Sequence, residues 1–347
     1  MQAVDEKVLA RVTECLSEGK ACWLATVVAT YGSSPRPVGS LLTCDSNGEI
    51  VGSLSGGCVE DDLLEKLTHG QLANERAQFF RYGDDEAEAE KLGLPCGGHL
   101  DIVVEALKAP MLPHFEEITR RVGARHLCQR TVNLRDRSIV TNNVDRFEEL
   151  RYDEDDQTLT QTYGPRYQLF LIGAGMVSQY VAEIAQALDY RVVVCDPRQD
   201  VLDGFPVEDV EKICDMPDDA IRETANDQHT AIVALTHDPR IDDMGLMEAL
   251  KTGAFYVGAM GSSRTSDSRR DRLRALDISE DELNRLHAPV GLPIGSKTPP
   301  EIALAILAEI TAIRKQQETL ESSELIVEGS LELESESLAA SSEVVVG

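Results

Sequence analysis

The chain of 347 residues carries 61 Asp and Glu against 33 Lys and Arg, a formal net charge of -28 at pH 7. Its length suits about two domains, each with its own core. This excess of carboxylates repels phosphate backbones and anionic lipid headgroups, so we expect no nucleic acid and no membrane as partner. A phosphate-bearing ligand would have to be held by local backbone N–H groups and a few arginines.

The opening residues and the cysteines favour a cytoplasmic protein. The sequence begins with a polar, amphipathic stretch instead of a basic and then apolar one, so we expect no secretory signal. No apolar run approaches the roughly 18 residues that a membrane span needs. The eight cysteines include no Cys-x-x-Cys pair, so neither a zinc ribbon nor a disulfide framework is expected.

The first half of the chain predicts a mixture of helices and strands. Residues 5–18 have apolar side chains at helical spacing, and residues 22–30 are typical of a buried strand. Residues 39–54 hold two short apolar runs about Asn47-Gly48, which favours a β-hairpin. Further predicted elements are helices at 58–70, 84–93 and 115–122, strands at 77–83 and 99–107, and a few edge strands among the polar residues 111–164.

A stiff loop precedes the predicted hairpin. The sequence "YGSSPRPVG" places Ser34 and Arg36 among glycine, serines and two prolines. A guanidinium on a rigid loop suits a phosphate or carboxylate ligand, because its planar fork loses little entropy on pairing. The alternative is a surface arginine that the prolines hold for stability.

One cysteine lies at a predicted strand-to-helix junction. In "LSGGCVEDDLL" Cys58 follows Gly56 and Gly57 and precedes a helix. The positive end of a helix favours a thiolate, which is a nucleophile and a soft metal ligand, and the glycine amides could form an anion-binding concavity. The acidic Glu60 in the same turn opposes this. Alternatively the glycines close a tight turn and Cys58 belongs to the core.

A second cysteine has the mirrored arrangement. In "GLPCGGHLDIV" Cys96 precedes Gly97 and Gly98 at a predicted helix-to-strand junction, and His99 adds a candidate donor. Junctions of this kind line clefts in layered α/β domains. Both the cysteine and the histidine could equally be structural residues.

A doubly wound parallel sheet is predicted for the second half. "YQLFLIGAGMVSQYVAEIAQALDYRVVVCDPR" is strand, glycine turn, helix and strand, the opening of a Rossmann-like fold. Gly173 and Gly175 occupy the first two glycine positions of the dinucleotide fingerprint, and Ser178 replaces the third. Asp196 stands where such folds place the acid that binds ribose hydroxyls. A nucleotide ligand and a purely structural scaffold both remain open.

A cluster of arginines follows a later strand. In "GAMGSSRTSDSRRDRL" we expect Arg264, Arg269 and Arg270 to form a basic patch at the ligand-binding end of the sheet. Pairing with Asp267 and Asp271 on the helix surface is the alternative.

Composition divides the chain into three regions. We expect a mixed α/β domain at 1–164, the doubly wound domain at 165–316 and a disordered tail at 317–347. The acidic stretch 151–165, which ends in Gly-Pro, marks the first boundary. The tail holds eight glutamates and no Lys or Arg, which is typical of disorder.

Together these motifs resemble the XdhC/CoxI family of accessory proteins for molybdenum hydroxylases. The resemblance rests on "GSSPRPVGSLL", "SGGCVE" and "LPCGGHLDI" in the first half and on "LIGAGMVS", "VVVCDPR", "GAMGSSRT" and "GLPIGSKTPPEIALAILAEI" in the second. It implies an N-terminal XdhC/CoxI-type domain and a Rossmann-like domain. It also implies a chaperone that binds molybdenum cofactor, supports its sulfuration and delivers it to an apo-enzyme of the xanthine dehydrogenase class.

The resemblance further implies partners and contact residues. A cysteine desulfurase would supply sulfur, a homodimer is expected, and the cofactor would be molybdopterin or its cytosine dinucleotide form. Cys58 and Cys96 are the candidates for sulfur handling or contact with molybdenum. The full set of residues expected to bind cofactor or nucleotide is Ser34, Arg36, Gly56, Gly57, Cys58, Cys96, Gly97, Gly98, Gly173, Gly175, Asp196 and Arg264.

Some positions depart from the family pattern, and other functions compete. Met176 stands where relatives usually have histidine, and Ser263-Arg264 replaces a typical double arginine. The main alternative is an NAD(P)-dependent oxidoreductase that uses the Rossmann-like domain. This alternative assigns no function to either Cys-Gly motif. A cysteine-based redox or sulfur-transfer enzyme and a scaffold without a small ligand are the others.

Overall fold

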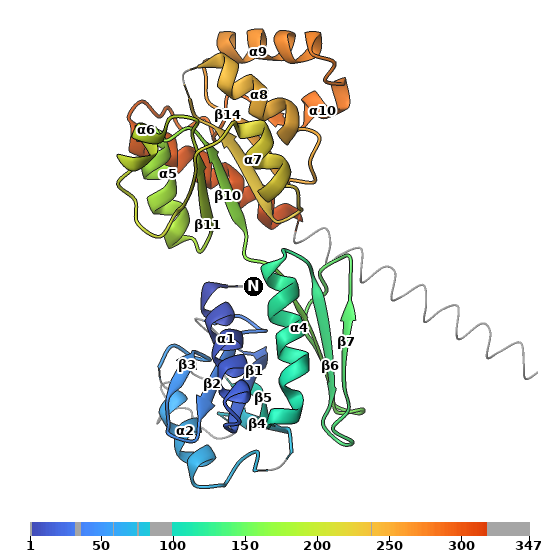
Figure 1. Cartoon of the computed structure of the whole chain (residues 1–347). Coiled ribbons are helices and arrows are strands. Elements are labelled where there is room, and N and C mark those ends of the chain that lie inside the picture. Colours follow the sequence, from blue (N-terminus) through green and yellow to red (C-terminus); the bar gives the residue numbers. More distant parts are fainter. Residues whose placement is uncertain are drawn as a thin grey trace, which may run out of the picture. The chain divides into compact units, whose positions relative to one another are not determined.

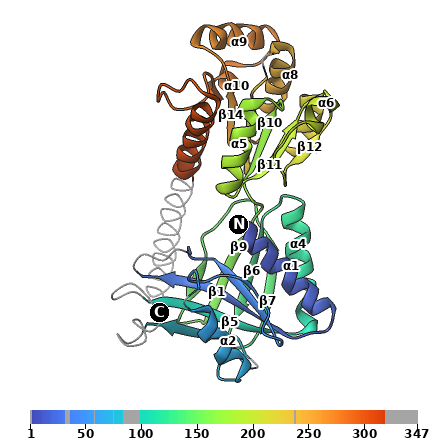
Figure 2. The same cartoon turned by 90° about the vertical axis from the view of Figure 1, so that its left-hand side faces the viewer.

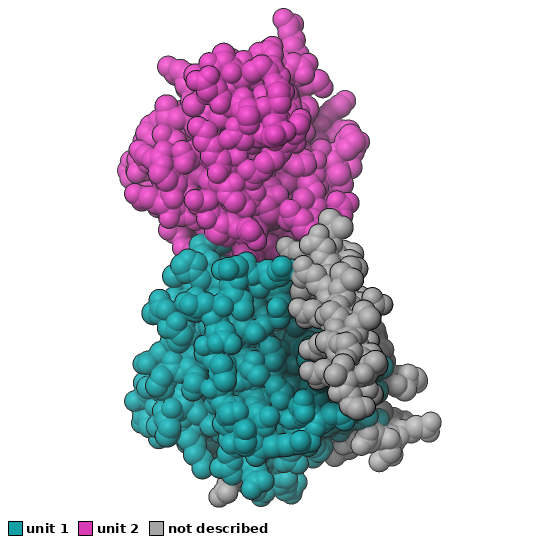
Figure 3. All heavy atoms as spheres, turned by 90° about the vertical axis from the view of Figure 1, so that its right-hand side faces the viewer, with its two compact units in different colours: residues 1–165 teal, residues 166–347 magenta. Residues whose placement is uncertain are grey.

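The computed structural model describes residues 2–31, 36–57, 59–74, 76–83, 99–236 and 238–317. The chain divides into two compact units, unit 1 at residues 1–165 and unit 2 at residues 166–347 (Figure 3). The predicted acidic helix at 84–93 and nearly all of the predicted tail lie outside the described residues. Of the described helices, none combines the length and the apolar character needed to cross a membrane.

Unit 1 is built on a five-stranded antiparallel sheet in the order β3-β2-β1-β5-β4. The predicted hairpin is confirmed, because the turn about Asn47-Gly48 joins β2 to β3 and Gly48 has the positive φ of +83° that such a turn requires. The strands are β1 (Cys22–Thr30), β2 (Leu41–Asp45), β3 (Ile50–Gly52), β4 (Gln78–Tyr82) and β5 (Leu100–Leu107).

Helices cover both faces of this sheet. Side chains alternate along β1, so Leu24 packs with α1 (Ala3–Ser17) and α4 (Leu112–Gly123) while Ala25 packs on the opposite side with α2 (Glu60–Thr68). Figures 1 and 2 show α1 and α4 side by side. A short 3-10 turn at Ala109–Met111 leads into α4.

A second antiparallel sheet completes unit 1, in the order β7-β6-β9-β8. The acidic stretch predicted as a domain boundary contains two of its strands, β8 and β9. Edge strands were expected within 111–164 but were not located in this stretch, because the buried positions of β9 include the polar Gln161 and Thr162. The strands are β6 (Cys128–Asn133), β7 (Ile139–Asn143), β8 (Arg151–Asp153) and β9 (Thr158–Tyr163).

Unit 2 is a parallel sheet in the order β12-β11-β10-β13-β14-β15. The chain starts at the central β10, moves outward through β11 and β12, and then crosses to the other side. This is the order of a doubly wound dinucleotide-binding sheet and confirms the predicted fold class. The strands are β10 (Gln168–Ile172), β11 (Arg191–Cys195), β12 (Glu211–Ile213), β13 (Thr230–Ala234), β14 (Tyr256–Ala259) and β15 (Leu286–His287).

Helices lie on both faces of the parallel sheet (Figure 1). Leu169 and Leu171 pack against α5 and the helix at 299–317, whereas Phe170 and Ile172 pack against α7, α8 and α9. The helices are α5 (Met176–Ala187), α6 (Gln199–Asp203), α7 (Pro217–Thr224), α8 (Pro239–Ala249), α9 (Ser263–Ala275) and α10 (Glu280–Asn284).

Candidate functional site

Strand direction brings the predicted motifs of unit 1 to one end of its sheet. β1, β3 and β4 end there, while β2 and β5 begin there, as the pairing of Thr30 with Leu100 shows. The connecting segments 31–40, 53–59 and 83–99 therefore emerge together. Every site residue predicted in the first half belongs to one of these three segments.

Several predicted site residues of unit 1 lie outside the described part of the chain. They are Ser34, Cys58, Cys96, Gly97 and Gly98. The geometry given below is that of their described neighbours.

Glu60 organises the loop that leads into α2. Its carboxylate is buried and accepts six hydrogen bonds from the residues that precede it. The donors are the backbone N–H groups of Leu54 (2.8 Å), Ser55 (3.0 Å), Gly57 (3.1 Å) and Val59 (3.1 Å) and the hydroxyls of Ser53 (2.7 Å) and Ser55 (2.7 Å).

These bonds hold Glu60 ionised. Burial alone would raise the pKa of this carboxyl, but the donors from Ser55, Ser53 and Leu54 outweigh burial and lower the pKa to about 2. Gly56 and Gly57 allow the loop to curl around the carboxylate, because their φ angles of +91° and +129° favour glycine.

The backbone N–H groups at the glycines do converge on an anion, but that anion is the side chain of Glu60, the first residue of α2. The sequence offered a clue in an acid at the start of a helix, where carboxylates are favourable. Our prediction treated Glu60 only as a charge opposing the thiolate of Cys58. The Gly57 Cα faces open space, since a Cβ built there would have no heavy atom within 4 Å.

Arg36 faces inward and ties two of the three segments together. Its Nε donates to the Ser53 carbonyl at 3.3 Å, and its Nη1 donates to Gln2 Oε1 at 2.6 Å. An ion pair with Asp5 at 3.5 Å completes the contacts with the start of α1. Arg36 is therefore engaged by groups of unit 1 itself, and its bond to the Ser53 carbonyl holds the start of the Glu60 loop.

Tyr31 and His99 join segment 31–40 to the end of segment 83–99. The Tyr31 N–H donates to the His99 carbonyl at 3.0 Å, and the two rings stack with centroids 3.9 Å apart. His99 Nε2 lies 3.9 Å from a carboxylate oxygen of Asp101. The same carboxylate accepts two hydrogen bonds from Arg81, of 2.6 and 2.7 Å. Among the residues that the structure describes, that Nε2 is buried without a hydrogen-bond partner. Tyr31 is exposed, so the outer side of its ring is accessible at this end of unit 1.

In unit 2 the glycine turn has the geometry that its sequence predicts. Gly173 has a φ of +98°, and a Cβ there would lie 2.6 Å from the side chain of Thr236. Gly175 faces open space. Ser178, which replaces the third glycine, is buried and donates its hydroxyl to the Gly173 carbonyl at 2.6 Å. The substitution therefore locks the turn.

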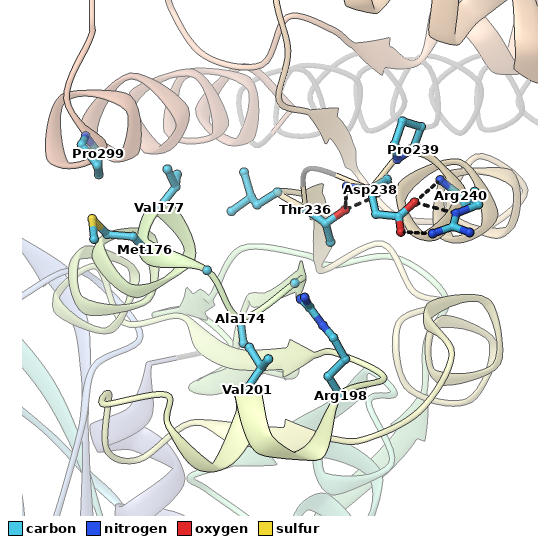
Figure 4. Close-up of a pocket in the computed structure, with 13 residues that line it drawn as sticks. Ala174, Met176, Val177, Arg198, Val201, Thr236, Asp238, Pro239, Arg240 and Pro299 are labelled. Atoms are coloured by element: carbon cyan, nitrogen blue, oxygen red, sulfur yellow. Dashed lines mark hydrogen bonds and ion pairs between the residues drawn. The ribbon is translucent and has the colours of Figure 1, made fainter.

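A cavity of about 940 Å³ opens beside this turn (Figure 4). Gly173 and Gly175 line it together with Arg198, Thr236 and Arg240, so it lies at the carboxyl ends of β10, β11 and β13. Ligands bind at this position in doubly wound sheets. Among the residues that the structure describes, no side chain caps α5, whose first turn faces the cavity.

Asp196 is saturated by hydrogen bonds from its own surroundings. Oδ1 accepts from the Arg198 backbone N–H at 3.1 Å and from Arg198 Nε at 2.8 Å, and Oδ2 accepts from Ala174 N–H at 3.1 Å and from Arg198 Nη2 at 2.8 Å. Burial alone would raise the pKa of Asp196, but these bonds outweigh it and lower the pKa. A ribose hydroxyl could reach this carboxylate only by displacing one of the four donors.

The predicted basic patch is largely internal. Arg269 is buried and pairs with Asp242 at 2.9 Å, and Arg270 donates to the carbonyls of Leu283 and Leu286, both at 2.7 Å. These arginines hold α9 against the unit because their partners come from other elements, which the local sequence did not reveal. Arg264 is exposed in the first turn of α9 and does not line the cavity.

Comparison with known sequences identifies relatives along most of the chain. A family profile described as XdhC and CoxI family matches residues 15–83, and one described as XdhC Rossmann domain matches residues 169–310. The chain is 28% identical over 321 residues to the molybdenum cofactor insertion chaperone PaoD of Escherichia coli, covering 90% of this chain and 89% of that protein. It is 25% identical to a Bacillus subtilis protein named as a probable xanthine dehydrogenase subunit, covering 87% of this chain and 96% of that protein.

A solved structure shares the fold. It is a crystal structure titled as a xanthine dehydrogenase from Bacillus halodurans, with a TM-score of 0.69 and 22% identity. The match covers 91% of this chain and 96% of the other.

Proposed function

The chain belongs to the XdhC and CoxI family, and on that premise we propose that it is a chaperone for molybdenum cofactor. It binds the cofactor as cargo and delivers it to a molybdenum hydroxylase of the xanthine dehydrogenase class. The names of two relatives support this role, one a molybdenum cofactor insertion chaperone and the other a probable xanthine dehydrogenase subunit.

The observation that carries the proposal is the meeting of three segments at one end of the unit 1 sheet. The contacts of Arg36 with Ser53 and of Tyr31 with His99 hold these segments together. Cys58 and Cys96 each belong to one of them, and thiolates suit a cargo with a soft metal and sulfur ligands. An exposed tyrosine stacked on a histidine suits a planar ring such as a pterin.

The finer parts of the proposal concern sulfur and assembly. The chaperone supports exchange of an oxo for a sulfido ligand on the cargo, with a cysteine desulfurase as the sulfur source. It works as a homodimer in the cytoplasm. Its cargo is molybdopterin or the cytosine dinucleotide form, and Ser34, Gly56, Gly57, Gly97 and Gly98 are the remaining contact candidates of unit 1.

Unit 2 supports a second candidate function. Its cavity lies beside Gly173 and Gly175 at the nucleotide position of the fold, so we propose that it binds a nucleotide. An NAD(P)-dependent oxidoreductase would use the same cavity. It would not use the meeting of the cysteine-bearing segments in unit 1, which is why the chaperone is the favoured function.

Delivery is tested by activation of an apo-hydroxylase of the xanthine dehydrogenase class. Incubation with the cofactor-loaded chain should restore activity to more of the enzyme than the same amount of free cofactor does. The cargo-free chain serves as the control. Equal activation by free and chaperone-bound cofactor would contradict a role in delivery.

A further inference from the structure

The sequence Asp-Pro-Arg occurs twice in unit 2, and both copies line the same cavity. One copy, residues 196–198, follows β11, and the other, residues 238–240, follows β13. Arg198 and Arg240 both line the cavity, and Figure 4 shows Arg198 apart from Asp238, Pro239 and Arg240 of the second copy.

Each copy forms the same clamp between its aspartate and its arginine. In the second copy Asp238 Oδ1 accepts from the Arg240 N–H and Nε, both at 3.0 Å, and Oδ2 accepts from Nη2 at 2.7 Å. The contacts of Asp196 with Arg198 match these atom for atom. The bond from Arg240 leads the causes that lower the pKa of Asp238 to about 2, so this clamp stays ionised.

The clamps hold two guanidinium groups in place without consuming them. A guanidinium has five N–H donors, and the clamp uses two of those on Arg198, from Nε and Nη2. The Arg198 side chain is 56% exposed although Asp196 is fully buried. The remaining donors can therefore pair with an anion, and little entropy is lost because the fork is already fixed.

The two clamps lie on opposite sides of the glycine turn. β11 and β13 both pair with β10, whose carboxyl end carries Gly173 and Gly175. Neighbouring strands lie about 4.8 Å apart, so the two clamps are separated by roughly 10 Å. A pyrophosphate at the glycine turn would have one fixed guanidinium on each side, each with N–H donors beyond those that its aspartate accepts, in a chain whose net charge of -28 otherwise repels it.

The clamp on β11 also decides which ribose the cavity accepts. In doubly wound sheets an acid after the second strand reads the free ribose hydroxyls, whereas an arginine nearby accepts a phosphate on the 2′ position. Here all four lone-pair positions of Asp196 are occupied, and Arg198 presents its free donors instead. The position is built for a phosphate.

We propose that the cavity of unit 2 binds a dinucleotide that carries a phosphate on its ribose, as NADP does, with Arg198 pairing with that phosphate. Arg240 interacts with the pyrophosphate side of the ligand. This inference rests on the nucleotide site proposed for unit 2 and is independent of the chaperone function proposed for unit 1.

The test is calorimetric titration of the full chain with NADP⁺ and NAD⁺, and with 2′,5′-ADP and 5′-ADP as minimal probes. We expect the 2′-phosphorylated member of each pair to bind roughly tenfold more tightly or better, the usual value of a charge-assisted pair. Arg198→Ala should bring NADP⁺ affinity down to that of NAD⁺. Arg240→Ala, which opens the matching clamp, should weaken both ligands by a similar factor.

The ratio of the two affinities within one preparation does not depend on the fraction that is folded. Arg198→Lys, which keeps the charge but loses the fork, should give an intermediate ratio. Equal binding of NADP⁺ and NAD⁺ by the wild type, or equal losses for both in Arg198→Ala, would overturn the inference while the nucleotide site stands. Absence of binding by all four probes would overturn the inference and the nucleotide site together, and would leave the chaperone proposal unaffected.

Discussion

The two units each place glycines between a strand and a helix, and the two turns differ in what their backbone N–H groups bind. In unit 1 the amides around Gly57 donate to the carboxylate of Glu60, the first residue of the following helix α2. In unit 2 one amide, that of Ala174, is held by Asp196, and the first turn of α5 faces a cavity of about 940 Å³. The unit 1 turn supplies its own anion, whereas the unit 2 turn leaves room for one.

This difference separates two uses of the same sequence signal. A turn whose amides are occupied by a neighbouring carboxylate has none of those donors left for an external anion. A turn beside an open cavity, flanked by Arg198 and Arg240, can bind phosphate. Glycines after a strand thus indicate that the backbone passes close to another group. A nearby acidic residue indicates that this group can be a carboxylate of the protein itself instead of a ligand.

The largest expected effect is on the stability of unit 1. Glu60→Gln replaces an acceptor of six hydrogen bonds with an amide that can accept only part of them, and should destabilise unit 1 by about 3 kcal/mol. Urea unfolding can be followed through the fluorescence of Trp23, the one tryptophan of the chain, which lies in β1. Asp61→Asn, an exposed neighbour in the same helical turn, should change stability by less than about 0.5 kcal/mol. Similar unfolding curves for the two variants would contradict the role given to Glu60.

The pH dependence of unit 1 should reveal the same carboxylate. The pKa of Glu60 falls from an ordinary 4.5 to about 2 in the folded chain. The stabilisation that ionised Glu60 gives to unit 1 is therefore fully present above about pH 4.5 and is lost as the pH falls toward 2. Unfolding followed at Trp23 across this window should show a steep loss of stability in the wild type. Glu60→Gln should show a shallower loss, and parallel pH profiles would count against the assignment.

In unit 2 the two glycines of the turn should respond differently to a methyl group. Gly173→Ala forces a Cβ within 2.6 Å of the Thr236 side chain at a φ of +98°. This should lower the free energy of unfolding of unit 2 by about 2 kcal/mol. Gly175→Ala meets no atom within 4 Å and has an extended backbone, so stability should be nearly unchanged while ligand binding weakens. Calorimetric melting and NADP⁺ titration of both variants separate the effects. A Gly175→Ala variant that binds normally would argue against ligand approach at this position.

The smallest expected effect concerns the residue that replaces the third glycine. Ser178→Ala removes the hydroxyl that donates to the Gly173 carbonyl and should destabilise unit 2 by about 1 kcal/mol. Ser268→Ala, on the exposed side of α9, is the matched control. If both variants melt like the wild type, the hydrogen bond does not stabilise the turn.

Much of the fold follows from local sequence signals. The Asn47-Gly48 turn and the glycines before α5 fixed the hairpin and the opening of the parallel sheet, because each needs a backbone conformation that few residues adopt. Edge strands were expected within 111–164, but the stretch that holds β8 and β9 was interpreted as a domain boundary, since Gln161 and Thr162 are buried without being apolar.

The site was harder to predict because its contacts cross the chain. Arg269 was expected in a surface patch, yet its partner Asp242 lies 27 residues away in sequence. The repeated Asp-Pro-Arg was visible in the sequence, but only the strand order places both copies at one cavity. Likewise, Arg36 and Ser53 become neighbours only because β2 and β3 pair as a hairpin.

The central claim is that unit 1 holds the cargo through its cysteine-bearing segments, and anaerobic binding of molybdenum cofactor to the full chain tests it most directly. Wild type should bind saturably, and Cys58→Ser or Cys96→Ser should weaken binding at least several-fold. Cys214→Ser, which changes an exposed cysteine of unit 2, should bind like the wild type. Absence of binding by the wild type, or binding that none of the cysteine variants alters, would contradict the claim.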